Sequence, residues 1–176
     1  MEIRLAEAAD LPAIVNIYNA AVPAYRSTAD TLPVTVGGRE LWFDAHTPER
    51  RPLWVAADAD GLLGWVGFQN FYGRPAYNPT AEISVYVAPA DQRHGVGRAL
   101  LEHALAAAPS VGICTVLAIV FAHNEASQRL FASFGFAPWG RLPGVAHMPD
   151  GRRDILILGR ELDTDAPVQR VVAKQP

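Results

Sequence analysis

Three polar side chains alternate with three aliphatic ones in the segment from Glu82 to Val87. Successive side chains of a strand point to opposite faces, so Glu82, Ser84 and Tyr86 are expected to share one face. A carboxylate on such a face can act as a general base, which takes a proton from a reacting group. The alternative is a surface glutamate on an amphipathic strand.

A glycine-containing turn follows this strand directly. It has the pattern Gln-x-x-Gly-x-Gly over residues 92–97, and apolar residues continue after it at helical spacing. Glycine lets backbone N–H groups approach an anion, and the positive end of a helix dipole adds to the attraction. Arg93 and Arg98 can offer forked donors to phosphate groups, although a solvated helix start would carry the same residues. The turn therefore predicts a phosphate cradle beside the polar strand face.

The elements that must position these groups are predicted in the order β-α-α-β-β-β-α-β-α-β-β. Strands are predicted at residues 3–5, 53–57, 62–71, 82–87, 112–121 and 155–158. The order also contains one more strand after the last helix, for which no bounds are predicted. Helices are predicted after Asp10, from Thr35 toward His46, after Gly97, and from Asn124 to Phe134. The dipeptide Asp60-Gly61 predicts a tight hairpin. The irregular segment 72–79 predicts a loop.

Composition limits the class of protein. The chain has 176 residues, of which 50% are hydrophobic, with a formal charge of −3. No basic run exceeds a pair of arginines, so nucleic acid is not an expected partner. No apolar run approaches the roughly 20 residues of a membrane span, and we expect a soluble cytoplasmic protein. Residues 1–162 are predicted to form a single domain, and the polar segment 163–176 a flexible tail.

The five histidines do not predict a metal site. None has metal-ligand spacing, and the chain has no His-Glu-x-x-His, no paired cysteines and no Gly-x-Ser-x-Gly. The sequence therefore lacks the residue patterns of zinc hydrolases and serine hydrolases, and no metal is expected.

Three features together resemble the GNAT acyl-CoA-dependent N-acetyltransferases: the element order, the strand–turn–helix unit, and the segment Asn124-Glu-Ala-Ser-Gln-Arg-Leu-Phe-Ala-Ser-Phe-Gly-Phe136. The resemblance covers about residues 2–162. It implies an α+β fold in which about four helices flank a mixed central sheet of six or seven strands.

Shorter segments look like one branch of that superfamily, the phosphinothricin and methionine sulfoximine acetyltransferases. They are Tyr18-Asn19, Pro33-Val-Thr35, Trp42-Phe43, Arg74-Pro-Ala-Tyr77, Glu82-x-Ser-Val-Tyr-Val87 and Pro149-Asp-Gly-Arg152. Enzymes of this branch acetylate the α-amine of glutamate-like compounds.

The resemblance implies acetyl-CoA as co-substrate. The N–H groups from Arg93 to Arg98 would hold the pyrophosphate, and Val87 and Ala88 would pair with the pantetheine amides. A bulge in their strand is expected to splay it away from the strand after Gly112. The predicted cofactor-binding residues are Val87, Ala88, Pro89, Gln92, Arg93, His94, Gly95, Val96, Gly97, Arg98, Asn124 and Ser127. For Asn124, a plain helix N-cap is the alternative.

The resemblance also assigns catalytic roles. Glu82 would take the proton of the attacking amine, directly or through a water, and the N–H of Val87 or its neighbour would stabilise the oxyanion. Phe131 stands where many related enzymes carry a tyrosine or histidine acid. Protonation of the departing thiolate is therefore left to Tyr86, to water, or to no acid at all.

For the acceptor, the predicted substrate-binding residues are Arg74, Tyr77, Glu82, Ser84, Tyr86 and Arg26. Each arginine could instead be only a surface charge. The favoured function is amino-acid N-acetylation by direct transfer in a ternary complex. The alternatives are acetylation of another amine, such as a protein N-terminus or an aminoglycoside, and a non-catalytic acyl-CoA-binding module. Related enzymes are often homodimers, and Trp42 or Trp139 could lie at such a contact.

Overall fold

The computed structural model describes residues 1–162, so the predicted tail at 163–176 lies outside the described residues. The strands are β1 Glu2–Leu5, β2 Leu53–Asp58, β3 Gly61–Asn70, β4 Thr80–Val87, β5 Thr115–Phe121, β6 Ala137–Met148 and β7 Gly151–Glu161. The α-helices are α1 Leu11–Asn19, α2 Glu40–Asp44, α3 Val96–Ala107 and α4 Glu125–Ala132. The predicted order of elements is confirmed.

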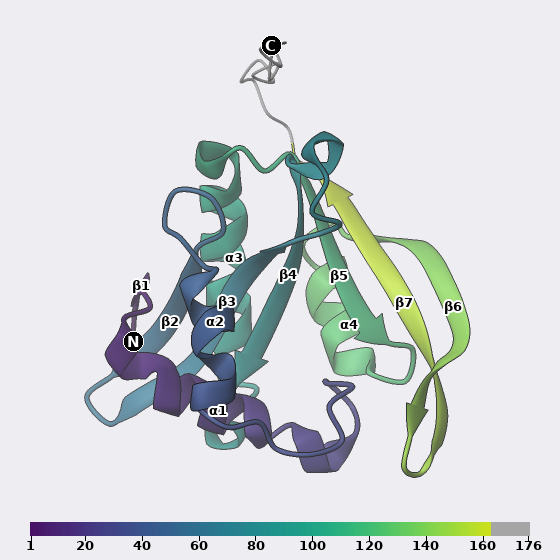
Figure 1. The fold of residues 1–176 in the computed structure, drawn as a ribbon, viewed down its shortest axis with the longest axis horizontal. Coiled ribbons are helices and arrows are strands. Elements are labelled where there is room, and N and C mark those ends of the chain that lie inside the picture. Colours follow the sequence, from purple (N-terminus) through teal and green to yellow (C-terminus); the bar gives the residue numbers. More distant parts are fainter. Residues whose placement is uncertain (163–176) are drawn as a thin grey trace.

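The strands form one mixed sheet in the order β1-β2-β3-β4-β5-β7-β6 (Figure 1). Only the β4–β5 pair is parallel; the other neighbours are antiparallel. Helices α1 and α2 cover one face, and α3 and α4 cover the other (Figure 1). The predicted α+β fold is confirmed.

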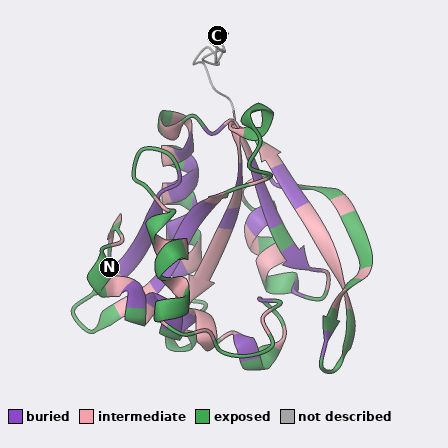
Figure 2. Cartoon of the chain, viewed as in Figure 1, coloured by how far each residue is buried: buried purple, intermediate pink, exposed green. Residues whose placement is uncertain are grey.

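Residue alternation in the strands builds a core on each face (Figure 2). In β2, Trp54 and Ala56 pack into the core that contains α3, whereas Leu53 and Val55 pack against α1. The same alternation sends Ile83 of β4 toward α3. The opposite face of β4 is thereby left to the polar residues predicted to share it.

Two regions differ from the sequence prediction. The segment from Thr35 forms a short 3-10 turn over Gly37–Arg39 before the five-residue α2, because paired glycines weaken an α-helix. The β6–β7 hairpin is also longer than the predicted strand at 155–158. β6 contains Pro138 and Pro143, which hide its strand pattern in the sequence but are tolerated at the sheet edge, where β6 lies.

β4 is paired fully on one side only. Its register with β3 runs from Ala81 opposite Asn70 to Val87 opposite Gly64, whereas its pairing with β5 ends at Glu82 opposite Leu117. The strands therefore separate beyond Glu82, as the sequence analysis expected. The predicted bulge is wrong, since the β3–β4 register has no shift. β5 instead follows β7, with which it pairs along its whole length.

Among residues 1–162, no helix is both long enough and apolar enough to span a membrane.

Candidate active site

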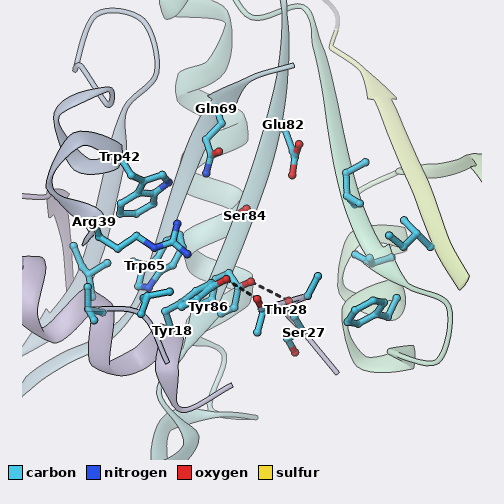
Figure 3. A pocket seen from close by; sticks show the side chains of 18 residues that line it. Tyr18, Ser27, Thr28, Arg39, Trp42, Trp65, Gln69, Glu82, Ser84 and Tyr86 are labelled. Atoms are coloured by element: carbon cyan, nitrogen blue, oxygen red, sulfur yellow. Dashed lines mark hydrogen bonds between the residues drawn. The ribbon is translucent and has the colours of Figure 1, made fainter. Parts of the chain in front are cut away.

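A pocket of about 230 Å³ lies on the α1 face of the sheet, beside the point where β4 leaves β5 (Figure 3). This volume is below the 300–1,000 Å³ of typical drug-sized sites, so the pocket suits a molecule of about amino-acid size. Side chains of Glu82, Ser84 and Tyr86 line it from β4. The predicted shared face of these three residues is therefore found, and it faces a cavity.

The Glu82 side chain is half-buried in this pocket. In the part of the chain that the structure describes, its carboxylate has no hydrogen-bond or ion-pair partner. Burial raises the pKa of the Glu82 carboxyl, because removal from water disfavours the charged form. A carboxylate with a raised pKa is a stronger base, which is the property that proton removal from an amine requires.

Tyr86 is fixed by contacts on several sides. Its hydroxyl donates a hydrogen bond to the carbonyl oxygen of Ser27 (2.9 Å), and its ring stacks on Trp65 with the centroids 4.7 Å apart. Burial, with a smaller contribution from Tyr18, raises the pKa of the Tyr86 phenol well above its ordinary value. The phenol is therefore protonated at neutral pH, but it is a weak acid. Its predicted catalytic role stays a prediction.

Residues 25–30, which we call the strap, supply Ser27, Thr28 and Ala29 to the pocket wall. Besides the Ser27–Tyr86 bond, Thr28 Oγ1 lies 2.5 Å from the Tyr18 hydroxyl (Figure 3). That hydroxyl also donates to Asp30 (2.6 Å). The strap is thus bonded to both α1 and β4. It brings a segment from early in the sequence over β4.

Asn124 bonds the same strap to α4. Its Oδ1 accepts from the Ser127 N–H (3.2 Å), while its Nδ2 donates to the Arg26 carbonyl (3.0 Å) and to Ser27 Oγ (3.3 Å). The side chain is buried, with 6% of the residue exposed. Asn124 therefore caps the N-terminus of α4 and bonds the strap to this helix. The cofactor contact predicted for Asn124 and Ser127 stays a prediction.

The Gln92–Gly97 turn presents backbone N–H groups without partners. Arg93 and Gly95 have φ values of +66° and +87°, and such left-handed residues turn successive amides toward one side. Within residues 1–162, no hydrogen bond is found from the N–H groups of Arg93 to Arg98; the first N–H of this region to be bonded is that of Ala99, to the Gly95 carbonyl (3.0 Å). These free donors at the start of α3 can bind phosphate oxygens.

The end of β4 points one N–H toward the gap. The Ala88 N–H donates to the Leu63 carbonyl on the β3 side (2.8 Å), and the Ala88 carbonyl accepts from the Asp91 N–H (2.9 Å). Since successive N–H groups of a strand alternate in direction, the Val87 N–H points away from β3, toward the opening beside β5. The Val87 N–H is therefore open to the gap, and its predicted role as oxyanion donor stays a prediction. The groups of Ala88 are already bonded, and Pro89 begins a 3-10 turn.

The side chains of Arg74, Tyr77 and Arg26 do not come together with the β4 residues. All three residues are exposed, and none lines the pocket. The loop that carries Arg74 and Tyr77 nevertheless begins just after β3, which supplies Gln69 to the pocket wall beside Glu82 (Figure 3). Their predicted substrate contacts stay predictions.

The sequence analysis missed Arg39, which lines the pocket and bonds Asp30 of the strap (3.0 Å). The available signal was its place three residues before Trp42 in a predicted helix, a spacing that puts both residues on one face. Trp42 also lines the pocket rather than an outer surface. Phe131, by contrast, is 4% exposed and packs edge-on against Phe136, so its position in α4 offers no acid.

Comparisons with known proteins agree with this geometry. Residues 14–136 match the model of the Acetyltransferase (GNAT) family. The chain is 51% identical to the Bacillus subtilis protein named "Putative phosphinothricin acetyltransferase YwnH", over 92% of this chain and 99% of that protein. It is 33% identical to the L-methionine sulfoximine/L-methionine sulfone acetyltransferase of Pseudomonas paraeruginosa, over 92% of this chain and 94% of that one.

Among solved structures, the fold is similar to a GNAT superfamily phosphinothricin acetyltransferase from Sinorhizobium meliloti in complex with acetyl-CoA. The TM-score is 0.89 at 26% identity, and the match covers 98% of this chain and 95% of that one. The pocket, the amide cradle and the separated strands thus occur in a chain whose sequence and fold match one enzyme family. This chain belongs to the GNAT acetyltransferase family and is an acyltransferase similar to the phosphinothricin acetyltransferases.

Proposed function

We propose that this enzyme transfers the acetyl group of acetyl-CoA to the amine of a small amino-acid-like acceptor, by direct transfer in a ternary complex. Phosphinothricin and methionine sulfoximine represent the acceptor class. The observation that carries the proposal is the unpartnered, half-buried Glu82 carboxylate beside the unpaired edge of β4. The names of the Bacillus and Pseudomonas relatives support the acceptor class, and the acetyl-CoA complex of the Sinorhizobium structure supports the donor.

Acetyl-CoA, the acetyl donor, would bind along the unbonded N–H groups before α3 and along the gap between β4 and β5 of the described chain. The N–H groups from Arg93 to Arg98 would bind the pyrophosphate, and the pantetheine arm would enter between β4 and β5. This arrangement would bring the thioester carbonyl to the Val87 N–H, which would stabilise the oxyanion. We take residues 1–162 as one catalytic domain.

The transfer itself needs one base and one leaving group. The amine nitrogen attacks the thioester carbon while Glu82, directly or through a water, takes the amine proton. The C–S bond then breaks, and the thiolate leaves. Because a thiol has a pKa of about 8.5, the thiolate can leave without an enzyme acid, in keeping with the apolar Phe131. Arg74, Tyr77 and Arg26 remain proposed acceptor contacts.

A thiol-release assay with product mass spectrometry tests the proposal. Acetyl-CoA would be incubated with phosphinothricin, methionine sulfoximine, methionine sulfone, ordinary amino acids, an N-terminal peptide and an aminoglycoside. We expect thiol release with the amino-acid analogues. Binding of acetyl-CoA without thiol release across this panel would contradict the proposal and favour a binding module, and release with the peptide or drug alone would favour another amine.

We also propose that the enzyme is a cytoplasmic homodimer. β6 exposes Trp139, Leu142 and Val145, whose exposed fractions are 50%, 43% and 50%. Exposed large apolar side chains on an edge strand are a candidate protein interface. Light scattering on the purified chain tests the dimer, and a monomer at micromolar concentration would contradict it.

A further inference from the structure

The pocket has one positive and one negative residue in its lining. Within the described chain, Arg39 is the only cationic residue that lines it, and Glu82 is the only acidic one. The two lie on different elements at separate sides of the cavity (Figure 3). A ligand that fills this pocket therefore meets a base at one end and a guanidinium at the other.

The Arg39 guanidinium is held in place before any ligand arrives. Its Nη2 donates to Asp30 Oδ2 (3.0 Å), and its Cζ lies 4.7 Å from the Tyr18 ring centroid and 5.6 Å from that of Trp42. Its side chain is 24% exposed. Two aromatic rings and a carboxylate thus fix its position, which lowers the entropy cost of binding a ligand there.

Most of its donors remain available. A guanidinium carries N–H donors on all of its nitrogens, and in the part of the chain that the structure describes only Nη2 makes a hydrogen bond. The planar fork can donate to two oxygens of one ligand group, such as a phosphinate, a sulfone or a carboxylate. A protonated amine or an alkyl group offers it no acceptor.

Asp30 also reduces the need for a negative charge on the ligand group that binds Arg39. Its carboxylate offsets much of the Arg39 charge but does not itself line the pocket. Binding at Arg39 then depends on directed hydrogen bonds more than on net charge. The uncharged oxygens of a sulfone should therefore be accepted as well as the charged oxygens of a phosphinate.

We infer that Arg39 binds the oxygen-bearing group at the end of the acceptor side chain, the end remote from the amine that reacts at Glu82. Ser84 and the rings of Trp65 and Tyr86 line the space between these ends. The acceptor is then an α-amino acid with an oxygen-rich side-chain terminus. This assignment rests on the proposed amino-acid acetyltransferase function.

The test compares three acceptors that differ in this terminus: phosphinothricin, methionine sulfone and norleucine, which has no side-chain oxygen. Arg39→Met should lower kcat/KM for the first two by about 10- to 100-fold, the range for one lost charge-assisted hydrogen bond. For norleucine we expect a change within about twofold. If Arg39→Met does not fold, Arg39→Lys carries the test, with a smaller selective loss because the charge stays and the fork is lost.

Two further variants distinguish ligand binding by Arg39 from an effect on pocket shape. Asp30→Asn keeps a side-chain oxygen that can accept from the Tyr18 hydroxyl and from Arg39, and the Tyr18 and Trp42 rings beside Arg39 are unchanged. The preference for oxygenated acceptors should therefore persist. Arg141→Met removes the Arg141–Asp154 pair outside the pocket and should leave all three acceptors unchanged.

The outcomes are distinguishable. Equal losses for all three acceptors in Arg39→Met would show that Arg39 only shapes the pocket, and equal losses for all three in Asp30→Asn would show the same of the Arg39–Asp30 pair. A native enzyme that acetylates norleucine as well as the oxygenated acceptors would overturn the Arg39 assignment alone. A native enzyme that binds acetyl-CoA but acetylates no amino acid would overturn the proposed function, and this inference with it.

Discussion

The Tyr86 hydroxyl and the Ser27 carbonyl oxygen are joined by a 2.9 Å hydrogen bond across a separation of 59 residues. The bond connects β4, the strand that carries Glu82, to the strap, so the strand and the pocket wall hold each other in position. The raised pKa of Tyr86 keeps its donor proton in place at neutral pH.

Replacement of Glu82 by glutamine should reduce kcat by about 100-fold or more, the usual range for loss of a general base. Acetyl-CoA affinity should be retained, because the amide cradle is untouched. In the native enzyme, kcat/KM should rise with pH through the raised pKa of Glu82, since only the carboxylate accepts a proton. Steady-state kinetics of both enzymes between about pH 6 and 9 provide the measurement. If Glu82→Gln has the same kcat as the native enzyme over that range, Glu82 is not the base.

The same substitution should stabilise the fold. Burial raises the folded-state pKa of Glu82 above its unfolded value, so the native state loses stability as pH rises through this interval and the carboxyl ionises. Glu82→Gln removes that cost and should raise Tm at neutral pH, with the difference vanishing in acid, where Glu82 is protonated. Melting curves at both pH values test this. A lower Tm at neutral pH would instead mean that the charged carboxylate stabilises the pocket.

Gly97→Val should weaken coenzyme A binding by at least about tenfold, equal to about 1.4 kcal/mol. A Cβ at Gly97 would lie 3.4 Å from Val87 Cγ2 and 3.6 Å from Leu130 Cδ2, so alanine fits but the branched γ-carbons of valine crowd the cradle. Calorimetry compares the two variants, with Gly97→Ala as the control for folding. Undiminished affinity in Gly97→Val would count against this register of the cradle.

Asn124→Asp should loosen the strap while leaving α4 capped. Aspartate keeps an acceptor for the Ser127 N–H but loses the donors to Arg26 and Ser27. Hydrogen exchange across residues 25–30 should therefore accelerate. Asn124→Ala should add the loss of the cap, a further cost of about 1 kcal/mol.

Unchanged exchange of the strap in Asn124→Asp would show that the other strap contacts suffice. A selective loss of acetyl-CoA affinity in this variant, with α4 intact by circular dichroism, would support the cofactor contact predicted for Asn124.

Arg74→Ala should raise KM for an acidic amino acid by about 10-fold, as expected for one charge-assisted hydrogen bond, and should change KM for acetyl-CoA far less. Arg74 is exposed and lies outside the pocket lining. Its role thus requires either closure of its loop or a contribution to a second subunit. Equal effects on both substrates would contradict an acceptor role.

Local rules predicted the parts of the site that depend on neighbouring residues. Alternation placed Glu82, Ser84 and Tyr86 on one face, and glycine spacing located the turn before α3. The cap position of Asn124 follows from the same kind of local pattern. These features need no knowledge of the tertiary fold.

Contacts between distant segments could not be predicted in this way. The bond from Asn124 to Arg26 spans 98 residues, and Arg39 is held at the pocket by Asp30 of the strap and by the rings of Tyr18 and Trp42. The bulge expected in β4 is wrong, because the β3–β4 register has no shift, while β5 pairs with β7 along its whole length. The separation of β4 from β5 thus involves pairing with a strand that lies later in the chain, which a local pattern in β4 does not reveal.

The incomplete pairing of β4 gives the protein an edge strand inside its own sheet. Edge strands with free backbone groups are templates for pairing with other chains, and proteins normally cover them. Here the cover would be the co-substrate, so coenzyme A would also act as a folding ligand that closes the sheet. The enzyme should then resist aggregation and heat in proportion to the logarithm of coenzyme A concentration, and cells depleted of the co-substrate would hold it in its most association-prone form.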